Sequence, residues 1–376
     1  MRTPIAWLNI IQHKKRTAAA LAGIAFSILL IFMQLGFLGA TRKNATVVYD
    51  LMDFDLLLCS NTFLTLTKAG SFERLALVQA QSSNAVEHAS GVLVRNSLLL
   101  DESDQTEKRV LMLSINTQDP VFRDPNLALK TSRLRERASM LLDRRSIPGF
   151  GSWDVGEFRM VNDEALQIVG DYEMGIGILA STSMVVSHET TTLLGDGVPV
   201  TKYNLGLIKL KEGSDAVSVR KDLLARLPGT VRLMTREELN RKEQVFYLNT
   251  KPIGIMFRIG AAVAFIVGAV ILYQILSSEI SNRMGEYATL KAMGYSPAFV
   301  YIIGIQQGII YSVLGFIPAC ILGMLLYNVL HGISGFHLWM PLGRALFVFV
   351  LALLMCSIAS MFALGKIRNA DPADLF

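Results

Sequence analysis

Four long apolar stretches constrain the fold of this 376-residue chain more than any other feature. A helix needs about 20 apolar residues to cross a bilayer, and the stretches at 17–41, 253–276, 299–330 and 342–365 are all long enough. The first stretch follows a basic cluster, and a secretory signal peptide has the same order of basic and apolar residues. Its apolar core is too long for a signal, and no small-residue cleavage site follows it. We therefore expect an α-helical membrane protein with four transmembrane helices, the first of them uncleaved.

The distribution of lysine and arginine predicts how these helices are oriented. Basic residues precede the first stretch, lie between the second and third, and follow the fourth, whereas 331–341 contains none. Because lysine and arginine accumulate on the cytoplasmic side, both termini and segment 277–298 are expected in the cytoplasm. An amphipathic helix is expected at 1–16 and a short tail at 366–376. The region 42–252 is then outside.

Charge counts agree with this orientation. The region 42–252 holds 26 basic and 27 acidic residues, and the rest of the chain holds 10 and 4. The net charge of +5 therefore arises from the parts expected near the cytoplasmic face. Membrane lipids explain this charge, and no nucleic acid is expected as a partner.

The outer region 42–252 is large enough for a domain with its own core. Its patterns mix strands with helices, so we expect a large extracytoplasmic α+β domain between the first and second transmembrane helices. A break at 147–152, which contains proline and glycine, suggests two lobes. Helical stalks are expected at 42–50 and 236–248. The expected strands are 54–59, 91–100, 109–116, 165–172, 203–210 and 230–234, and the expected helices are 71–81, 126–142, 214–227 and 236–248.

Segment 277–298 is a polar stretch between two strongly apolar ones. Ile280, Met284 and Tyr287 recur at helical spacing, and Gly294 can adopt the left-handed conformation that ends a helix. The alternative is an ordinary polar loop, but an amphipathic, capped segment is more typical of a docking element. The residues expected to couple this segment to a partner are Arg283, Glu286, Tyr287, Leu290, Lys291 and Gly294.

Small residues recur four apart along the apolar stretches and predict close contacts between helices. Gly260, Ala264 and Gly268 form such a stripe in the second stretch, and Gly23 belongs to one in the first. The middle of each stretch lacks ionisable residues. Proton pumps and ion-coupled transporters normally carry charged groups at that depth, so these two classes are disfavoured.

Motifs for common catalytic sites are missing from the sequence. It has no Gly-x-x-x-x-Gly-Lys-Ser/Thr string, so the chain is not expected to hydrolyse ATP by itself. It also has neither His-Glu-x-x-His nor Gly-x-Ser-x-Gly. The histidines are scattered, and Cys59 has no second ligand at metal-binding spacing. We expect no catalytic residues, no cofactor and no metal.

Five strings carry a family resemblance. They are PIAWLN at 4–9, PIGIMF at 252–257, YQIL at 273–276, EYATLKAMGY at 286–295 and ADPADLF at 370–376. With the order of the expected helices, they resemble the MacB/FtsX-type permeases of ABC exporters, and among these the DevC subfamily, the permease of the DevBCA exporters of cyanobacteria. The resemblance covers essentially the whole chain and implies a MacB-like permease fold. MacB carries its ATPase on the same chain, and this sequence departs from it there.

The resemblance implies a homodimer in the bacterial inner membrane, driven by an ABC ATPase on a separate chain. It also implies a periplasmic adaptor (a DevB-like membrane fusion protein) and a TolC-like outer-membrane channel. Permeases of this type are regarded as mechanotransmitters that move a lipid-like or amphiphilic substrate out of the periplasm, a glycolipid being the subfamily's example. Two alternatives stay open: an FtsX-like lever that controls a periplasmic hydrolase, and a lipoprotein-releasing permease. A heterodimer of this chain with a related permease is a further alternative to the homodimer.

Overall fold

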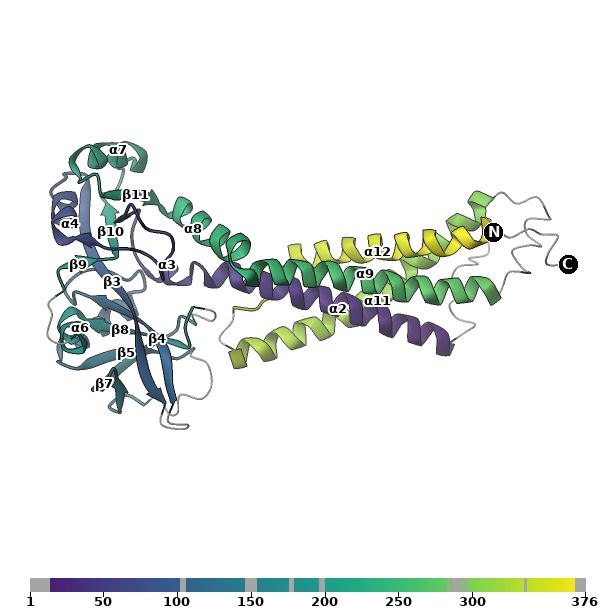
Figure 1. The fold of residues 1–376 in the computed structure, drawn as a ribbon, viewed down its shortest axis with the longest axis horizontal. Coiled ribbons are helices and arrows are strands. Elements are labelled where there is room, and N and C mark those ends of the chain that lie inside the picture. The colour runs from purple at the N-terminus through teal and green to yellow at the C-terminus, as the bar shows by residue number, and fades with distance from the viewer. Residues whose placement is uncertain are drawn as a thin grey trace. The chain divides into compact units, whose positions relative to one another are not determined.

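The computed structural model describes residues 14–101, 106–145, 154–175, 179–195, 200–282, 285, 293, 297–334 and 337–368. The chain divides into two compact units. One, here called the helical unit, comprises Met1–Gly39, Ile255–Val329 and Leu338–Phe376. The other, here called the sheet unit, comprises Ala40–Gly254 and Leu330–His337. Each unit is described by itself (Figure 1).

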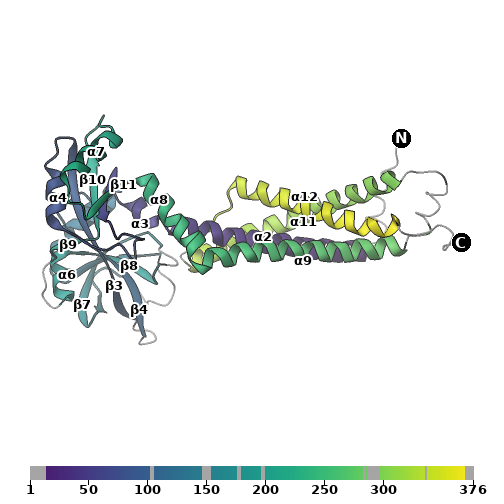
Figure 2. The same cartoon turned by 45° about the horizontal axis from the view of Figure 1, so that its top comes forward.

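The helical unit contains four long apolar helices. They are α2 (Lys14–Asn44), α9 (Pro252–Asn282), α11 (Pro297–Ser334) and α12 (Leu342–Arg368). Within the part of the chain that the structure describes, these are the helices long and apolar enough to cross a membrane. The predicted four transmembrane helices are therefore confirmed, with a large domain inserted after the first of them (Figure 2).

Apolar side chains pack between these helices and also cover their outer faces. Ile24 and Phe32 of α2 share one buried cluster with Leu272 of α9, Tyr311 of α11 and Met355 of α12. Many other large apolar side chains of α9, α11 and α12 are exposed. A helix that is apolar all round is typical of a membrane span, because its outer face meets lipid.

The sheet unit is built on one nine-stranded sheet with the order β11-β1-β10-β3-β4-β8-β5-β7-β6. Neighbouring strands are antiparallel except for the parallel pairs β4–β8 and β5–β7. A separate two-stranded sheet joins β2 (Phe72–Glu73) and β9 (Lys202–Tyr203). The nine strands are β1 (Leu56–Ser60), β3 (Val86–Asp101), β4 (Thr106–Ile115), β5 (Ser139–Asp143), β6 (Phe158–Val161), β7 (Glu164–Tyr172), β8 (Thr182–Ser187), β10 (Leu205–Leu210) and β11 (Val231–Thr235).

Both faces of the main sheet are buried where β1 crosses it. Leu57 and Cys59 belong to one hydrophobic cluster, while Leu56 and Leu58 belong to another. Successive side chains of a strand point to opposite faces, so this alternation places the two clusters on opposite sides of the sheet. The helices of the unit are α3 (Val47–Leu51), α4 (Arg74–Gln81), α5 (Pro125–Lys130), the 3₁₀ turn η1 (Thr131–Arg135), α6 (His188–Leu194), α7 (Ala216–Arg226) and α8 (Arg236–Val245).

The chain leaves the sheet unit through a short and irregular path. The π-helical turn η2 (Phe246–Thr250) follows α8, and Lys251 then adopts an extended conformation with φ −82° and ψ 141°. Pro252 begins α9. A residue before proline is forced away from helical geometry, so η2 and α9 cannot join into one continuous helix.

One predicted helix is wrong in its second half. The expected helix at 126–142 is α5 followed by η1, and the chain then forms strand β5. Ala138 has a positive φ of 58°, which separates η1 from β5. Strand β5 is buried throughout and pairs with β7 and β8, and a short run buried on both faces shows no strand periodicity. The break predicted at 147–152 lies outside the described residues, so the two-lobe division stays a prediction.

Candidate functional site

The predicted coupling residues lie outside the part of the chain that the structure describes. This holds for Arg283, Glu286, Tyr287, Leu290, Lys291 and Gly294. Their role as a docking element therefore stays a prediction. The predicted amphipathic helix at 1–16 is likewise described only from residue 14, where α2 begins.

The predicted packing residues lie where helices approach closely. A Cβ atom added to Gly23 would lie 2.8 Å from Cγ2 of Ile271, and one added to Gly260 would lie 2.6 Å from the side chain of Gln34. At Gly268 it would collide with Sδ of Met355. Ala264 is buried in the same stripe. Glycine at these positions therefore leaves room for side chains of the neighbouring helix between α9 and both α2 and α12.

The sheet unit contains a second candidate that the sequence patterns did not single out. It lies where α3, the short helix that follows α2, meets α8, the helix that leads to α9 (Figure 1). Tyr49, Arg236 and Glu243 make this contact, and together with the neighbouring Lys242 of α8 we call them the stalk junction. Helix α8 begins with a capping box, in which Thr235 and Glu238 each accept a hydrogen bond from the other's backbone.

Glu243 is the buried centre of the stalk junction. Its Oε1 atom accepts hydrogen bonds of 2.7 Å from the Tyr49 hydroxyl and 2.7 Å from the backbone N–H of Leu66. Its Oε2 atom is buried and has no hydrogen-bond partner among the described residues. Burial raises the pKa of Glu243 to about 7, against the opposing effects of the Tyr49 and Leu66 hydrogen bonds and the charge of Lys242.

Arg236 ties the start of α8 to the end of α3. Its guanidinium donates to the carbonyl oxygens of Tyr49 at 2.7 Å, Met52 at 2.8 Å and Phe54 at 3.1 Å. The carbonyls at a helix C-terminus lack partners within the helix and carry partial negative charge. Arg236 satisfies them and also lies 3.9 Å above the Phe54 ring. The two segments that continue into α2 and α9 are thus fastened to each other.

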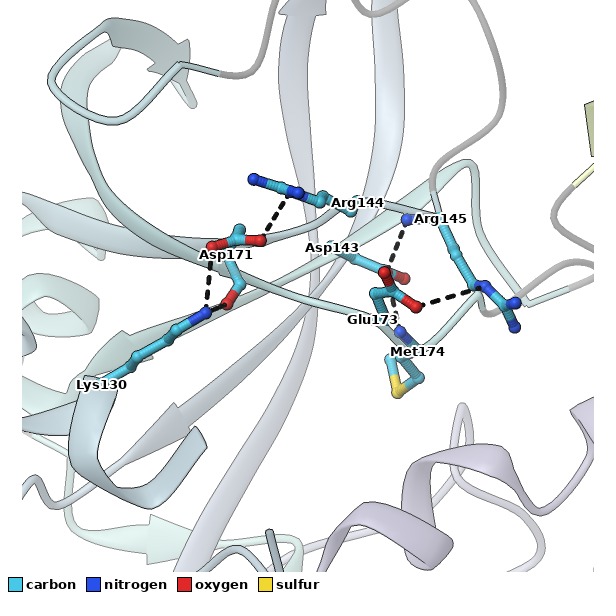
Figure 3. A network of polar contacts seen from close by, with 7 residues as sticks. All are labelled: Lys130, Asp143, Arg144, Arg145, Asp171, Glu173 and Met174. Atoms are coloured by element: carbon cyan, nitrogen blue, oxygen red, sulfur yellow. Dashed lines mark hydrogen bonds and ion pairs between the residues drawn. The ribbon is translucent and has the colours of Figure 1, made fainter. Parts of the chain in front are cut away.

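A second polar network surrounds the end of β5 (Figure 3). The buried Asp143 carboxylate accepts hydrogen bonds from the backbone N–H groups of Arg145, Met174 and Gly175 and from the Ser183 hydroxyl. Burial raises its pKa, and these four hydrogen bonds oppose the increase. Asp143 therefore fixes the backbone of Arg145. On the neighbouring strand, Asp171 pairs with Lys130 and Arg144.

Arg145 reaches the segment that connects α11 with α12. Its Nη2 lies 3.0 Å from Nε2 of His331 and its Nη1 lies 3.4 Å from Nε2 of His337. Because arginine only donates, both Nε2 atoms accept. Nδ1 of His337 then carries the hydrogen and donates to Oδ1 of Asn44, the last residue of α2, at 3.0 Å. We call Asp143, Arg145, His331 and His337 the loop anchor.

The loop anchor requires a neutral His337. A protonated imidazole has no acceptor atom, and it would face the guanidinium of Arg145. Burial, followed by the charge of Arg145, lowers the pKa of His337 to about 4. Among the described residues, the stalk junction and the loop anchor together hold the chain segments that continue into α2, α9, α11 and α12.

A serine–histidine contact in the sheet unit does not form a nucleophilic site. Ser114 Oγ lies 2.8 Å from Nδ1 of His188 and is hydrogen-bonded to the Thr191 hydroxyl. Ser114 is completely buried, so a substrate cannot reach it. In the described parts of the chain, no group of three histidine, cysteine or acidic side chains could hold a metal ion.

Glu243 could have been found from the sequence, but its partners could not. Leu239, Glu243 and Tyr247 are four residues apart, so a carboxylate lies on an otherwise apolar stripe, which signals a buried and paired acid. Tyr49 is 194 residues away from Glu243 in the chain. No local pattern links the two residues.

Comparisons with known proteins bear on the C-terminal part of the chain. The model of the FtsX-like permease C-terminal family matches residues 258–372, which include most of α9 and all of α12. No curated protein sequence matches the chain. Residues 258–372 are thus similar to FtsX-like permeases. This match supports an ABC-type permease subunit, and with the four apolar helices it fits a multi-pass protein of the inner membrane.

Two solved structures are similar to the chain at low identity. One is the extracellular domain of the noncanonic ABC-type transporter YknZ from Gram-positive bacteria, with 12% identity over 49% of this chain and 100% of that chain and a TM-score of 0.34. The other is the periplasmic region of MacB from Actinobacillus actinomycetemcomitans, with 8% identity over 52% of this chain and 94% of that chain and a TM-score of 0.36.

Proposed function

We propose that the chain is the permease subunit of an ABC-type exporter and transmits motion from a separate ATPase to the sheet unit. The observation that carries this proposal is the match of residues 258–372 to the FtsX-like permease C-terminal family. The given sequence contains no P-loop, and in this proposal a separate ATPase subunit supplies the energy. Segment 277–298 is the proposed docking element for that ATPase.

The stalk junction and the loop anchor support mechanical transmission. Arg236 and Glu243 bind the segments that continue into α2 and α9 to each other. Arg145 binds His331 near the end of α11 and His337 in the connection to α12. We therefore expect these hydrogen bonds to transmit a displacement of the helices to the main sheet. A flexible connection without such bonds would not transmit it. In this proposal the sheet unit is the part that acts on the substrate or on a partner outside the membrane.

The finer assignments follow the resemblance to the DevC subfamily. We propose a homodimer with both termini in the cytoplasm. Its further partners are a DevB-like periplasmic adaptor and a TolC-like outer-membrane channel. The proposed substrate is lipid-like or amphiphilic. Recovery of an adaptor with the purified chain would favour export, whereas recovery of a cell-wall hydrolase alone would favour a signalling lever.

The test is the stimulation of ATPase activity in a reconstituted complex of this chain with its ATPase. Glu286→Lys reverses a charge in the docking element and should reduce the stimulation at least about tenfold. Gly294→Val should act similarly, because valine does not readily adopt a positive φ at a helix end. Glu212→Lys, an exposed charge reversal in the sheet unit, is the matched control. Full stimulation by both docking variants would contradict the proposal.

A further inference from the structure

The sheet unit contains a pocket that neither the stalk junction nor the loop anchor uses. It has a volume of about 450 Å³, which is within the usual size range for small-molecule sites. Three parts of the chain line it: residues 66–71, the middle of β3, and residues 200–204 around β9. Thr191 of α6 completes the lining. We call this the basic pocket.

The charged side chains that line the basic pocket are all cationic. Lys68, Arg95 and Lys202 line it, and among the described residues of its lining there is no aspartate or glutamate. Lys202 is paired with Glu73 at 3.0 Å. Lys68 and Arg95 are exposed and have no ion pair with any residue that the structure describes. Two uncompensated cations in one concavity attract an anion, because a recess lined by one sign of charge concentrates the opposite sign.

Part of the lining of the basic pocket is apolar. Val200 is half-buried, and Leu66, Leu93 and Val94 line the pocket with little exposed surface. A purely ionic ligand such as free phosphate would leave this surface in contact with water. A ligand with an apolar group next to its anionic end would cover it, at a gain of roughly 25 cal/mol for each Å² of apolar surface.

Two polar side chains of the basic pocket, Asn204 and Thr191, are already hydrogen-bonded within the protein. Asn204 Oδ1 accepts from the backbone N–H of Val94 at 2.7 Å, and Asn204 Nδ2 donates to the carbonyl oxygen of Gly70. Gly70 has a φ of +65°, which a residue with a side chain would rarely adopt. Thr191 Oγ1 donates to the carbonyl oxygen of Ser187. Asn204 thus holds the rim to β3, and recognition of a ligand falls to Lys68 and Arg95.

We propose that the basic pocket binds a small amphiphile whose oxyanion, a carboxylate or phosphate ester, contacts Lys68 and Arg95 while its apolar group packs against Val200 and the exposed edge of Val94. Arginine and lysine both bind such oxyanions through charge-assisted hydrogen bonds. This site goes beyond the permease function, because a permease can transmit motion without it. The binding test below needs no ATPase, so its failure is separable from a failure of coupling.

Binding is to be measured by calorimetry on the full chain in nanodiscs of neutral phosphatidylcholine, with hexyl phosphate as the probe. We expect the double variant Lys68→Gln/Arg95→Gln to weaken binding at least about tenfold. The matched control Lys221→Gln/Arg226→Gln removes two exposed charges from α7 and should bind like the parent. Because Lys68 and Arg95 are exposed, an unchanged melting temperature should verify that the double variant folds.

Two further ligands separate the parts of the proposal. Inorganic phosphate tests the oxyanion alone and hexanol tests the apolar group alone, and both should bind at least about tenfold more weakly than hexyl phosphate. Equal binding of inorganic phosphate would overturn the amphiphile and leave an anion site. Absence of hexyl phosphate binding, or equal binding by the double variant, would overturn the site itself.

Discussion

The two units of the chain hold their elements together by different means. In the sheet unit, buried polar groups such as Glu243, Arg236 and Asp143 make directed hydrogen bonds between segments distant in sequence. In the helical unit, contacts occur at glycines such as Gly260 and Gly268 and at apolar side chains. Directed hydrogen bonds are lost when a segment shifts, whereas apolar packing has no preferred direction. The comparison indicates that directed hydrogen bonds fix the segments beside the sheet. Close apolar packing, with a directed bond such as the one from the Tyr327 hydroxyl to the Phe32 carbonyl, holds the helices together.

The comparison is tested most strongly by removing the Arg236 guanidinium, which should have the largest effect on the sheet unit. Arg236→Gln removes hydrogen bonds to three carbonyls of α3 and its C-terminal extension, and hydrogen bonds to charged groups contribute about 1.5–3 kcal/mol each. We expect the local unfolding free energy of α3 to fall by about 4 kcal/mol. Hydrogen exchange of Val47–Leu51 should then accelerate by about a hundredfold or more. Arg226→Gln on α7 is the control, and similar exchange in both variants would show that α3 is held by other contacts.

The buried carboxylate of Glu243 should make stability depend on pH. Its folded pKa of about 7 is above the ordinary value of 4.5, so the folded chain binds the proton more tightly. This stabilisation is complete below pH 4.5 and is lost as the pH rises to 7, a change of about 3 kcal/mol. Tyr49, Tyr247 and Lys242 are the other titratable groups near it.

Glu243→Gln keeps an acceptor for Tyr49 and Leu66 and removes the charge. Melting curves of the full chain from pH 5 to 8 should show a decrease for the parent and a much smaller one for the variant. Identical pH profiles would mean that Glu243 does not titrate as a buried group.

Close packing in the helical unit is tested at Gly268. Gly268→Ala places a methyl group against Met355 and Ser27, and overpacking of this kind costs about 2 kcal/mol. Gly343→Ala, at the start of α12, meets nothing within 4 Å and is the control. Thermal denaturation in detergent should therefore separate the two variants. If both melt alike, α9 and α12 do not rely on close approach at this glycine.

The loop anchor should respond to pH in the opposite direction from the stalk junction. His337 has a folded pKa of about 4 against an ordinary value of 6.5, so the unfolded chain binds the proton more tightly. Stability is then complete above pH 6.5 and is lost as the pH falls towards 4. The ring is partly exposed, and solvent screening reduces the effect to about 1 kcal/mol between pH 7 and 5.

His337→Gln should abolish this acid sensitivity, read from hydrogen exchange of residues 337–345 after correction for the intrinsic rate. His88→Gln in β3 is the control. Acid-accelerated exchange that persists in His337→Gln would assign the sensitivity to another group.

The features predictable from sequence are those that depend on composition over many residues. The four spans follow from hydropathy alone, and β3, β4 and β7 follow from long apolar runs. Strand β5 does not, because Met140 to Leu142 fit a buried helix as well as a strand until the partners β7 and β8 are known. The stalk junction could not be predicted either, because its hydrogen bond joins Tyr49 and Glu243 from opposite ends of the domain sequence. The coupling segment rests on sequence alone.

The irregular path at Lys251 has a consequence for what α9 can pass to α8. A continuous helix carries torque, because every turn is hydrogen-bonded to the next. Here one extended residue stands between η2 and Pro252, and its backbone dihedrals can absorb rotation. Covalent bonds still resist tension. We therefore expect this joint to pass a pull along α9 towards Glu243 more fully than a twist of α9.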